Sequence, residues 1–424
     1  MNSAPAFNPI TFVQDRVRAH RGDAHGPNGD QPEPTPLCVL CGVLIEEWRA
    51  IFSQIDEPPE ICERRKANID RIRHEMKSSR PNFSFMEDDS FSGYVQLSYD
   101  SSIVGQGETR LWLSDVYFLY GSDRINDLEN NNDEAMKFFL ARGYYDEDND
   151  ICIDAPDGTP IYNVLDHCDG SYYPHSILHA HLYPFHQACY EILCKILAAK
   201  FGIQKPDPKA LHHTLDDMNY ARLAFAYGKI LGQEFSWICY PGEEHVVADP
   251  IWPTPVTEDI VIQTAFIKFL TREHAANKAR PDPPPISDLS QKVKRDPFDQ
   301  LGYDILYEIS SFLSRESARD LIRASPAVLC AASSDRFWLQ RIRLDMPWYW
   351  ELDDILEAFR KIDLEISYRM FYFWLDKATL PTYGMTGLLN YANRRRIWAA
   401  CERFAAHYHY IAHSLSLPPE SEDE

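Results

Sequence analysis

The chain has 424 residues, of which 45% are hydrophobic and 13% aromatic, so it can form two or more packed domains and is not disordered overall. Its 42 basic and 64 acidic side chains give a formal net charge of −22, which opposes nucleic acid or an anionic membrane surface as the main partner. We see no signal peptide or transmembrane run, and the ten cysteines are scattered, so we expect an intracellular protein, cytoplasmic or nuclear, with thiols or metal ligands.

The N-terminal part of the chain has a mixed pattern. Residues 1–36 carry glycines and prolines among polar residues, which predicts a disordered arm. Alternating apolar residues at 91–99 and a dense aromatic run at 111–120 predict two strands. A Pro-Asp-Gly-Thr turn at 156–159 between two apolar runs predicts a hairpin.

Helices follow in the same region. Apolar residues from Phe185 to Leu197 recur at helical spacing and Gly202 stands where a C-terminal cap is expected, which predicts a helix beginning at Pro184. A second helix is predicted over 258–270. We therefore expect a mixed N-terminal domain over residues 37–274.

Composition divides the remainder. Residues 275–295 hold four prolines among charged residues and predict a stiff linker. A module of three short helices is expected at 296–345, a helical region at 346–416 and an acidic tail at 417–424. The predicted fold class is α+β, with a mixed N-terminal domain, a proline-rich linker, a three-helix module and a helical C-terminal region.

The three-helix module has a distinct apolar pattern. Helical spacing over 301–313 predicts an amphipathic helix of about three turns. A second helix with Ser317 as its N-cap should end before Pro326, since proline disfavours helix at the preceding residue. A third helix contains Trp338. Three short helices bury little apolar surface, so the module needs a partner.

This segment resembles the F-box family, whose opening pattern places Phe, Leu-Pro, Glu-Ile-Leu, Ile and an aromatic-Leu pair in order. The matching positions are Phe298, Leu301, Gly302, Asp304, Ile305, Leu306, Ile309, Phe312 and Leu313, followed by Leu321 and Trp338 as later apolar anchors. The resemblance covers residues 296–345, with Gly302 in place of the family's proline. It implies docking on the adaptor of an SCF-type ubiquitin ligase. The docking residues that it implies are Phe298, Leu301, Gly302, Ile305, Leu306, Ile309 and Phe312.

Two pairs of metal-binding residue types lie far apart in the sequence. Cys38 and Cys41 can face one ion across a tight turn, and Gly42 can take the positive φ that such a turn needs. His186 and Cys189 are three residues apart on the predicted helix, whose N-terminus favours a thiolate. Together they predict a structural zinc site. The alternative is that Cys189 fills the core, because the pairs are separated far more widely than zinc-finger ligands.

The N-terminal region also resembles that of a group of fungal F-box proteins, in which Cys-x-x-Cys-Gly near a tryptophan, here Trp48, precedes Pro-Phe-His-x-x-Cys. The two resemblances imply a non-catalytic subunit that recognises a protein substrate for an SCF ubiquitin ligase. Its partners would be the ligase adaptor and that substrate, while ubiquitin transfer takes place on other subunits.

A rival interpretation comes from the histidine-rich segment His175 to His186. His179 and His181 form a His-x-His pair of the kind that metal-dependent hydrolases use to hold a catalytic ion. Such a protein would be an enzyme, with the three-helix module serving only in packing. The basic cluster at 394–396 is interpreted as a solvated face or an internal ion-pair set.

Overall fold

A computed structural model describes a large part of the chain, and the statements below concern that part. The described residues are 37–43, 45, 63, 67, 70, 74, 99, 101–104, 112–121, 137–145, 151–154, 158, 160–161, 183–220, 227–228, 230, 242–251, 264–270, 295–361 and 366–416. The predicted arm, most of the predicted linker and the predicted acidic tail lie outside these residues, as does most of the predicted strand at 91–99.

The chain divides into two compact units. Met1–Trp252 and Pro381–Glu424 together form one, called here the sheet unit, and Pro253–Leu380 form the other, the helical unit. This division differs from the predicted one: residues 381–416 belong to the sheet unit, whereas 346–380 belong with the module at 296–345. None of the helices in the described parts of the chain is both long and apolar enough to span a bilayer.

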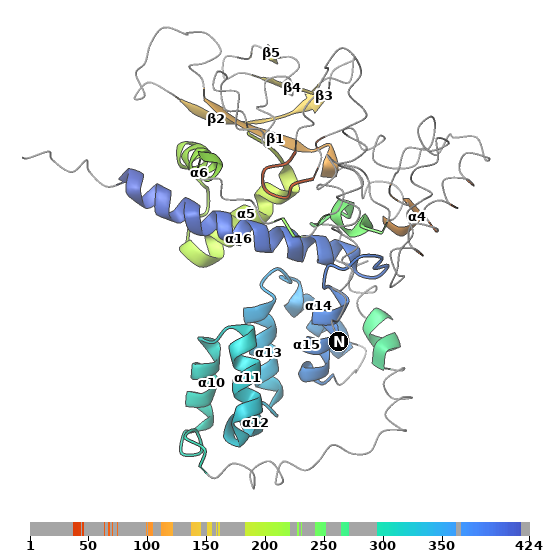
Figure 1. The fold of residues 1–424 in the computed structure, drawn as a ribbon, viewed down its shortest axis with the longest axis vertical. Helices are drawn as coiled ribbons and strands as arrows, with labels where there is room; N and C mark the ends of the chain where they lie inside the picture. Colours follow the sequence, from red (N-terminus) through yellow and green to blue (C-terminus); the bar gives the residue numbers. More distant parts are fainter. Residues whose placement is uncertain are drawn as a thin grey trace, which may run out of the picture. The chain divides into compact units, whose positions relative to one another are not determined.

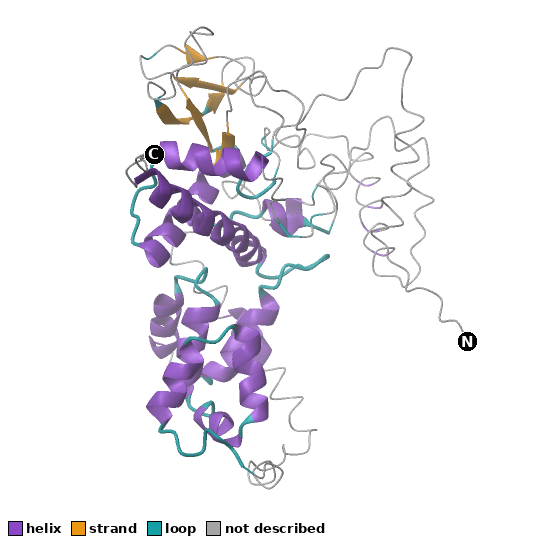
Figure 2. Cartoon of the chain, turned by 60° about the vertical axis from the view of Figure 1, so that its left-hand side comes forward, coloured by secondary structure: helices purple, strands orange, loops and turns teal. Residues whose placement is uncertain are grey.

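The described strands lie in the sheet unit and form two small antiparallel sheets (Figure 2). In the first sheet the central strand β1 pairs with β2 on one side and β6 on the other, so that Phe118 lies opposite both Ala141 and Pro184. The strands of this sheet are β1 (Val116–Gly121), β2 (Phe138–Arg142) and β6 (Tyr183–His186), and those of the second are β3 (Tyr144–Tyr145), β4 (Ile151–Asp154) and β5 (Pro160–Ile161). The pairing of β4 with β5 confirms the predicted hairpin.

The described part of the sheet unit also contains helices (Figure 1). They are α4 (Ser101–Val104), α5 (Gln187–Phe201), α6 (Pro208–Tyr220), the 3₁₀ helix η7 (Glu244–Val247) and α16 (Leu389–Ser416). Of these, α6 packs against β1 and β2, α5 lies against β6, and α16 packs against α5 and α6. Helix α5 buries the predicted apolar stripe and ends at Gly202, whose left-handed backbone lets its amide donate to Ala198 O. Its predicted start was wrong, because residues 183–186 pair with β1 as strand β6 and the helix begins at Gln187.

The helical unit contains a helix at 264–270 and six further helices in its described part. These six are α10 (Tyr303–Ser311), α11 (Arg315–Ala324), α12 (Pro326–Ala331), α13 (Asp335–Asp345), α14 (Leu352–Lys361) and α15 (Tyr368–Ala378). The module at 296–345 thus has four helices instead of the predicted three. Pro326 ends α11 but also begins α12, where Ser325 accepts a hydrogen bond from the Val328 amide as the N-cap. The N-cap of α11 is Ser314, not Ser317, and the Ser317 amide donates to it.

Two arginines that were expected on a solvated face or in an internal ion-pair set are buried in the sheet unit. Arg394 on α16 is fully buried and donates from Nε to the carbonyl of Pro250 at 2.5 Å. The neighbouring Asn393 donates to the carbonyl of Ala248 at 2.6 Å. Arg396 is also buried. Asn393 and Arg394 therefore satisfy backbone carbonyls that follow η7, which explains why these polar side chains stand on the buried face of α16.

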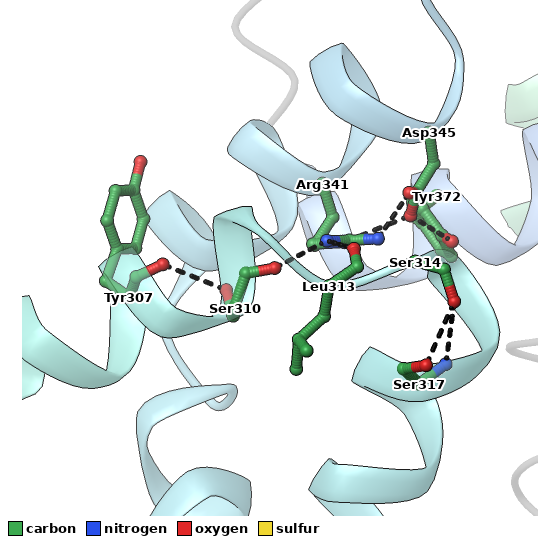
Figure 3. A network of polar contacts seen from close by, with 8 residues as sticks. All are labelled: Tyr307, Ser310, Leu313, Ser314, Ser317, Arg341, Asp345 and Tyr372. Carbon is green, nitrogen blue, oxygen red and sulfur yellow. Dashed lines mark hydrogen bonds and ion pairs between the residues drawn. The ribbon is translucent and has the colours of Figure 1, made fainter.

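A buried arginine ties three helices of the helical unit together (Figure 3). Arg341 on α13 donates to the carbonyls of Ser310 at 2.9 Å and Leu313 at 3.2 Å, at the end of α10. It also pairs with Asp345, which accepts from the Arg341 Nε at 3.0 Å. The hydroxyl of Tyr372 on α15 donates to the same carboxylate at 2.7 Å. One guanidinium thereby fixes how α10, α13 and α15 pack.

Replacing Arg341 by alanine should destabilise the helical unit strongly. The change removes the charged partner of the buried Asp345 carboxylate and the guanidinium donor to the Ser310 and Leu313 carbonyls, so we expect a loss of about 3–5 kcal/mol in the free energy of unfolding. Arg343→Ala is the matched control, because Arg343 makes an exposed ion pair with Asp353 and should cost less than about 1 kcal/mol. Urea denaturation followed by circular dichroism measures both, and equal losses would contradict the role assigned to Arg341.

Candidate metal centre

The first half of the site is a tight turn around Cys38 and Cys41. The Gly42 amide donates to the carbonyl of Cys38 at 2.7 Å, and the Cys38 amide donates to that of Val43 at 2.8 Å. Gly42 has φ 70°, as the sequence pattern predicted, because a left-handed residue is needed to close this turn. Both thiols therefore leave the turn on the same side.

The second half lies where strand β6 becomes helix α5. His186 is the last residue of β6 and the N-cap of α5, with extended backbone angles, while Cys189 lies in the first turn of the helix. The turn attaches directly to this strand, since the Val39 amide donates to the carbonyl of Pro184 at 3.0 Å. This backbone contact brings together two pairs of residues that are 145 positions apart.

The four predicted ligands converge. Ligand atoms of Cys38, Cys41, His186 and Cys189 all lie within 4.8 Å of one another, and each of the four residues is 0% exposed. Cys41 Sγ lies 3.4 Å from His186 Nδ1, and the His186 amide lies 3.4 Å from Cys38 Sγ. Tetrahedral bonds to one ion place ligand atoms about 3.5–4 Å apart, so small adjustments suffice. The cluster could therefore hold a metal ion.

The protonation of the thiols shows what a cation would contribute. Burial raises the pKa of the Cys38 and Cys189 thiols well above the ordinary value. Burial also opposes the Cys41 thiolate, but hydrogen bonds from Cys189 and Cys38, with the charge and hydrogen bond of His186, outweigh it and lower the pKa of Cys41. The metal-free cluster thus favours a single thiolate. A bound cation would stabilise the other two.

A residue that the sequence analysis did not assign to the site supports the turn. Arg396 of α16 donates to the carbonyl of Cys41 at 2.6 Å and to that of Tyr227 at 3.3 Å, and Asn393 Oδ1 accepts from it at 2.7 Å. Three thiolates with one divalent cation carry a net negative charge, which this buried guanidinium offsets. One feature of the sequence points to this role of Arg396: Asn393 and Arg396 are three residues apart, which places both side chains on one face of the helix.

Two aromatic residues lie next to the cluster. The Trp112 ring lies 4.8 Å from the His186 ring, between centroids, and the hydroxyl of Tyr227 donates to the carbonyl of Val39 at 2.7 Å. His186 Nε2 is buried without a hydrogen-bond partner among the described residues, whereas Nδ1 faces the thiols. The donor set of three sulfurs and one nitrogen, buried on all sides, fits an ion with four protein ligands.

The other predicted site residues fall into two groups. His175, His179 and His181 of the hydrolase interpretation lie outside the described residues, and His186 of that segment belongs to the cysteine cluster. The implied docking residues lie on or next to α10 in the helical unit. Gly302, Ile305 and Phe312 are exposed, Leu306 is buried, and Phe298, Leu301 and Ile309 are half-buried.

Comparisons with family models, with curated proteins and with solved structures found no match for this chain.

Replacing Gly42 by alanine tests how tightly the turn is packed. A Cβ at Gly42 would lie 2.4 Å from the Tyr227 ring, and φ there is 70°. Gly202 is a matched control, because its φ is 71° and nothing lies within 4 Å of an added Cβ. Both variants lose about 1–2 kcal/mol from the left-handed backbone, and we expect Gly42→Ala to lose about 1–3 kcal/mol more through overpacking. Equal stability of the two variants in urea denaturation would show that the turn is loosely packed.

Proposed function

We propose that this chain is a non-catalytic, F-box-type subunit of an SCF ubiquitin ligase, which docks on the ligase adaptor through α10 and presents a bound protein substrate. The observation that carries the proposal is the pair Ile305 and Phe312, whose side chains are 51% and 81% exposed. They are seven residues apart, and two helical turns place them on the same side of α10. Two large apolar side chains on one exposed face are suited to bind a partner.

The remaining motif residues support the same assignment by their burial. Leu306 is 5% exposed and forms a small core with Val328 and Ala331. The half-buried Phe298 and Leu301 pack against this core. The apolar pattern therefore serves two purposes: one set of side chains holds the helices together, while the other faces outward.

Gly302 retains the backbone shape that the family's proline would impose. It is the N-cap of α10, with φ −65° and ψ 156°, and an added Cβ would meet nothing within 4 Å. Proline fixes φ at about −65°, so the chain follows the same path with either residue. The expected difference is entropic, because glycine loses more conformational freedom when it is ordered.

For the sheet unit we propose that Cys38, Cys41, His186 and Cys189 hold a structural zinc ion. The support is the donor set, since three thiolates and one imidazole are a recurrent set for tetrahedral zinc. All four ligands come from the protein and are buried, which leaves no open position for a substrate. The ion would thus fasten the N-terminal turn to β6 and α5 and would take no part in chemistry.

The docking proposal is tested by replacing both Ile305 and Phe312 with alanine. We expect adaptor capture by the purified chain to fall by at least about 100-fold, since truncating central apolar contacts typically costs 2 kcal/mol or more each, while the melting temperature changes little. Leu344→Ala is the matched control, because Leu344 is 45% exposed on α13 and is not part of the motif. Surface plasmon resonance with immobilised adaptor measures the effect. Undiminished capture by the double variant would refute the proposal.

The zinc proposal is tested by metal content and by pH. Wild-type protein and Cys194→Ser, altered at a half-buried cysteine of α5 outside the cluster, should each contain one zinc per chain, and Cys189→Ser none. In the metal-free chain the raised pKa values keep Cys38 and Cys189 protonated at neutral pH, so zinc must displace both protons. The apparent affinity should therefore rise with pH, by about 100-fold per unit for two protons.

Elemental analysis and chelator competition between pH 6.5 and 8 provide these measurements. Zinc retained in full by Cys189→Ser would exclude this cluster as the site. An affinity independent of pH would instead show that the thiols are already deprotonated before the ion binds.

A further inference from the structure

A cavity of about 490 Å³ lies within the helical unit, lined mainly by α11, α13 and α15. This volume falls within the range of about 300–1,000 Å³ that is usual for ligand sites. The exposed docking residues of α10, Ile305 and Phe312, are not among its lining residues. The cavity is therefore separate from the face of α10 that we propose as the adaptor contact.

The apolar part of the cavity is aromatic. Trp338 lines it, with its indole N–H already donating to the carbonyl of Ala332 at 2.6 Å, so the ring presents only its faces and edges. Phe373 lies against this ring, 5.1 Å between centroids, and is 45% exposed. An exposed phenylalanine beside a tryptophan in a concave surface offers a contact for another ring.

The charged part of the cavity is strongly basic, although the chain is acidic overall. Five arginines and two aspartates line it. Two arginines are neutralised within the cavity wall, since Arg315 pairs with Asp376 and Arg341 with Asp345. The other three are exposed: Arg319, Arg323 and Arg369.

These three arginines are available to a ligand. Arg323 has only an exposed contact of 3.6 Å with Asp320, which contributes little. Arg369 lies over the Trp338 ring at 5.9 Å and, like Arg319, has no carboxylate partner among the described residues. The cavity therefore presents an uncompensated positive charge next to aromatic rings.

The spacing of the arginines indicates the shape of the ligand. Arg315, Arg319 and Arg323 follow one another at intervals of four along α11, so their side chains share one face at steps of about 6 Å. Alternate side chains of an extended peptide are spaced by about 6.6 Å on one side of the strand. Carboxylates at alternate positions of such a peptide would match the exposed guanidinium groups of Arg319 and Arg323, while Arg315 stays paired with Asp376.

We propose that this cavity binds an extended acidic peptide segment of a partner protein, with carboxylates at alternate positions along α11 and an aromatic side chain against Trp338 and Phe373. The Arg341 network fixes α13 and α15 beforehand, so the wall of the site is ordered before the ligand arrives (Figure 3). The negative charge of the whole chain repels acidic segments from other surfaces, which favours this local basic site.

The test uses the full chain and a labelled heptapeptide with glutamate at positions 1, 3, 5 and 7 and phenylalanine at position 4. Fluorescence polarisation should show saturable binding that weakens as salt rises from about 50 to 200 mM. Arg319→Ala with Arg323→Ala should raise the Kd by at least about tenfold, and Phe373→Ala should raise it by about fivefold or more. Arg343→Ala, which removes an exposed arginine outside the cavity, should change it less than about twofold.

Three results would overturn the proposal: an unchanged Kd for the double arginine variant, equal binding of the same peptide with glutamine in place of glutamate, or tighter binding of adenosine monophosphate than of the peptide. Because the arginines of the double variant are exposed, its circular dichroism should match the wild type. The Ile305→Ala and Phe312→Ala double variant should bind the peptide normally, so this test and the adaptor test can fail independently.

Discussion

The sheet unit depends on one backbone hydrogen bond and the side chains that it brings together. The amide of Val39 donates to the carbonyl of Pro184, which joins the N-terminal turn to the end of β6. This contact places three thiols and one imidazole in a fully buried space, where burial opposes charging more than one thiol. Burial is unfavourable for thiolates without a counterion, whereas a buried set of four ligands is favourable for thiolates that are bound to a cation. The turn, the strand end and the helix start are thus coupled through one cluster.

In the helical unit, Arg341 has a comparable position. Its guanidinium donates a hydrogen bond to the carbonyl of Ser310 at the end of α10. Its partner Asp345 accepts a hydrogen bond from Tyr372 on α15. A buried polar network of this kind adds order to the packing of the helical unit, because each of these helices has a defined partner atom. The two surfaces proposed for binding, the outer face of α10 and the cavity beside α11, are both built on helices that this residue holds.

Much of the local structure could be predicted from the sequence. The stripe of α5 with Gly202 as its cap, the hairpin of β4 and β5, and the four clustered ligands follow from spacing and turn chemistry. Predictions failed where one residue serves two local structures. Pro326 ends one helix and starts another, and His186 belongs to a strand although its apolar neighbours continue the helical pattern.

Tertiary contacts were harder to predict. Arg394 and Arg396 were expected on a solvated face or in an internal ion-pair set, because a run of arginines usually has one of these two environments. They are buried because the carbonyls of Pro250 and Cys41, far away in sequence, need donors. Whether an arginine side chain is buried depends on which backbone carbonyls lack a hydrogen-bond donor in the folded chain. A single sequence does not show which carbonyls these are.

The position of Arg396 also bears on how the protein is made. The cysteine turn is synthesised before the helical unit, but the guanidinium that donates to its Cys41 carbonyl comes 355 residues later, after the entire helical unit. A nascent chain could form the helical unit while the sheet unit still lacks α16. Contacts of such long sequence separation form slowly, because a long loop must close before they are made. During synthesis the thiols would thus be exposed to oxidation or to chaperones until the last helix arrives.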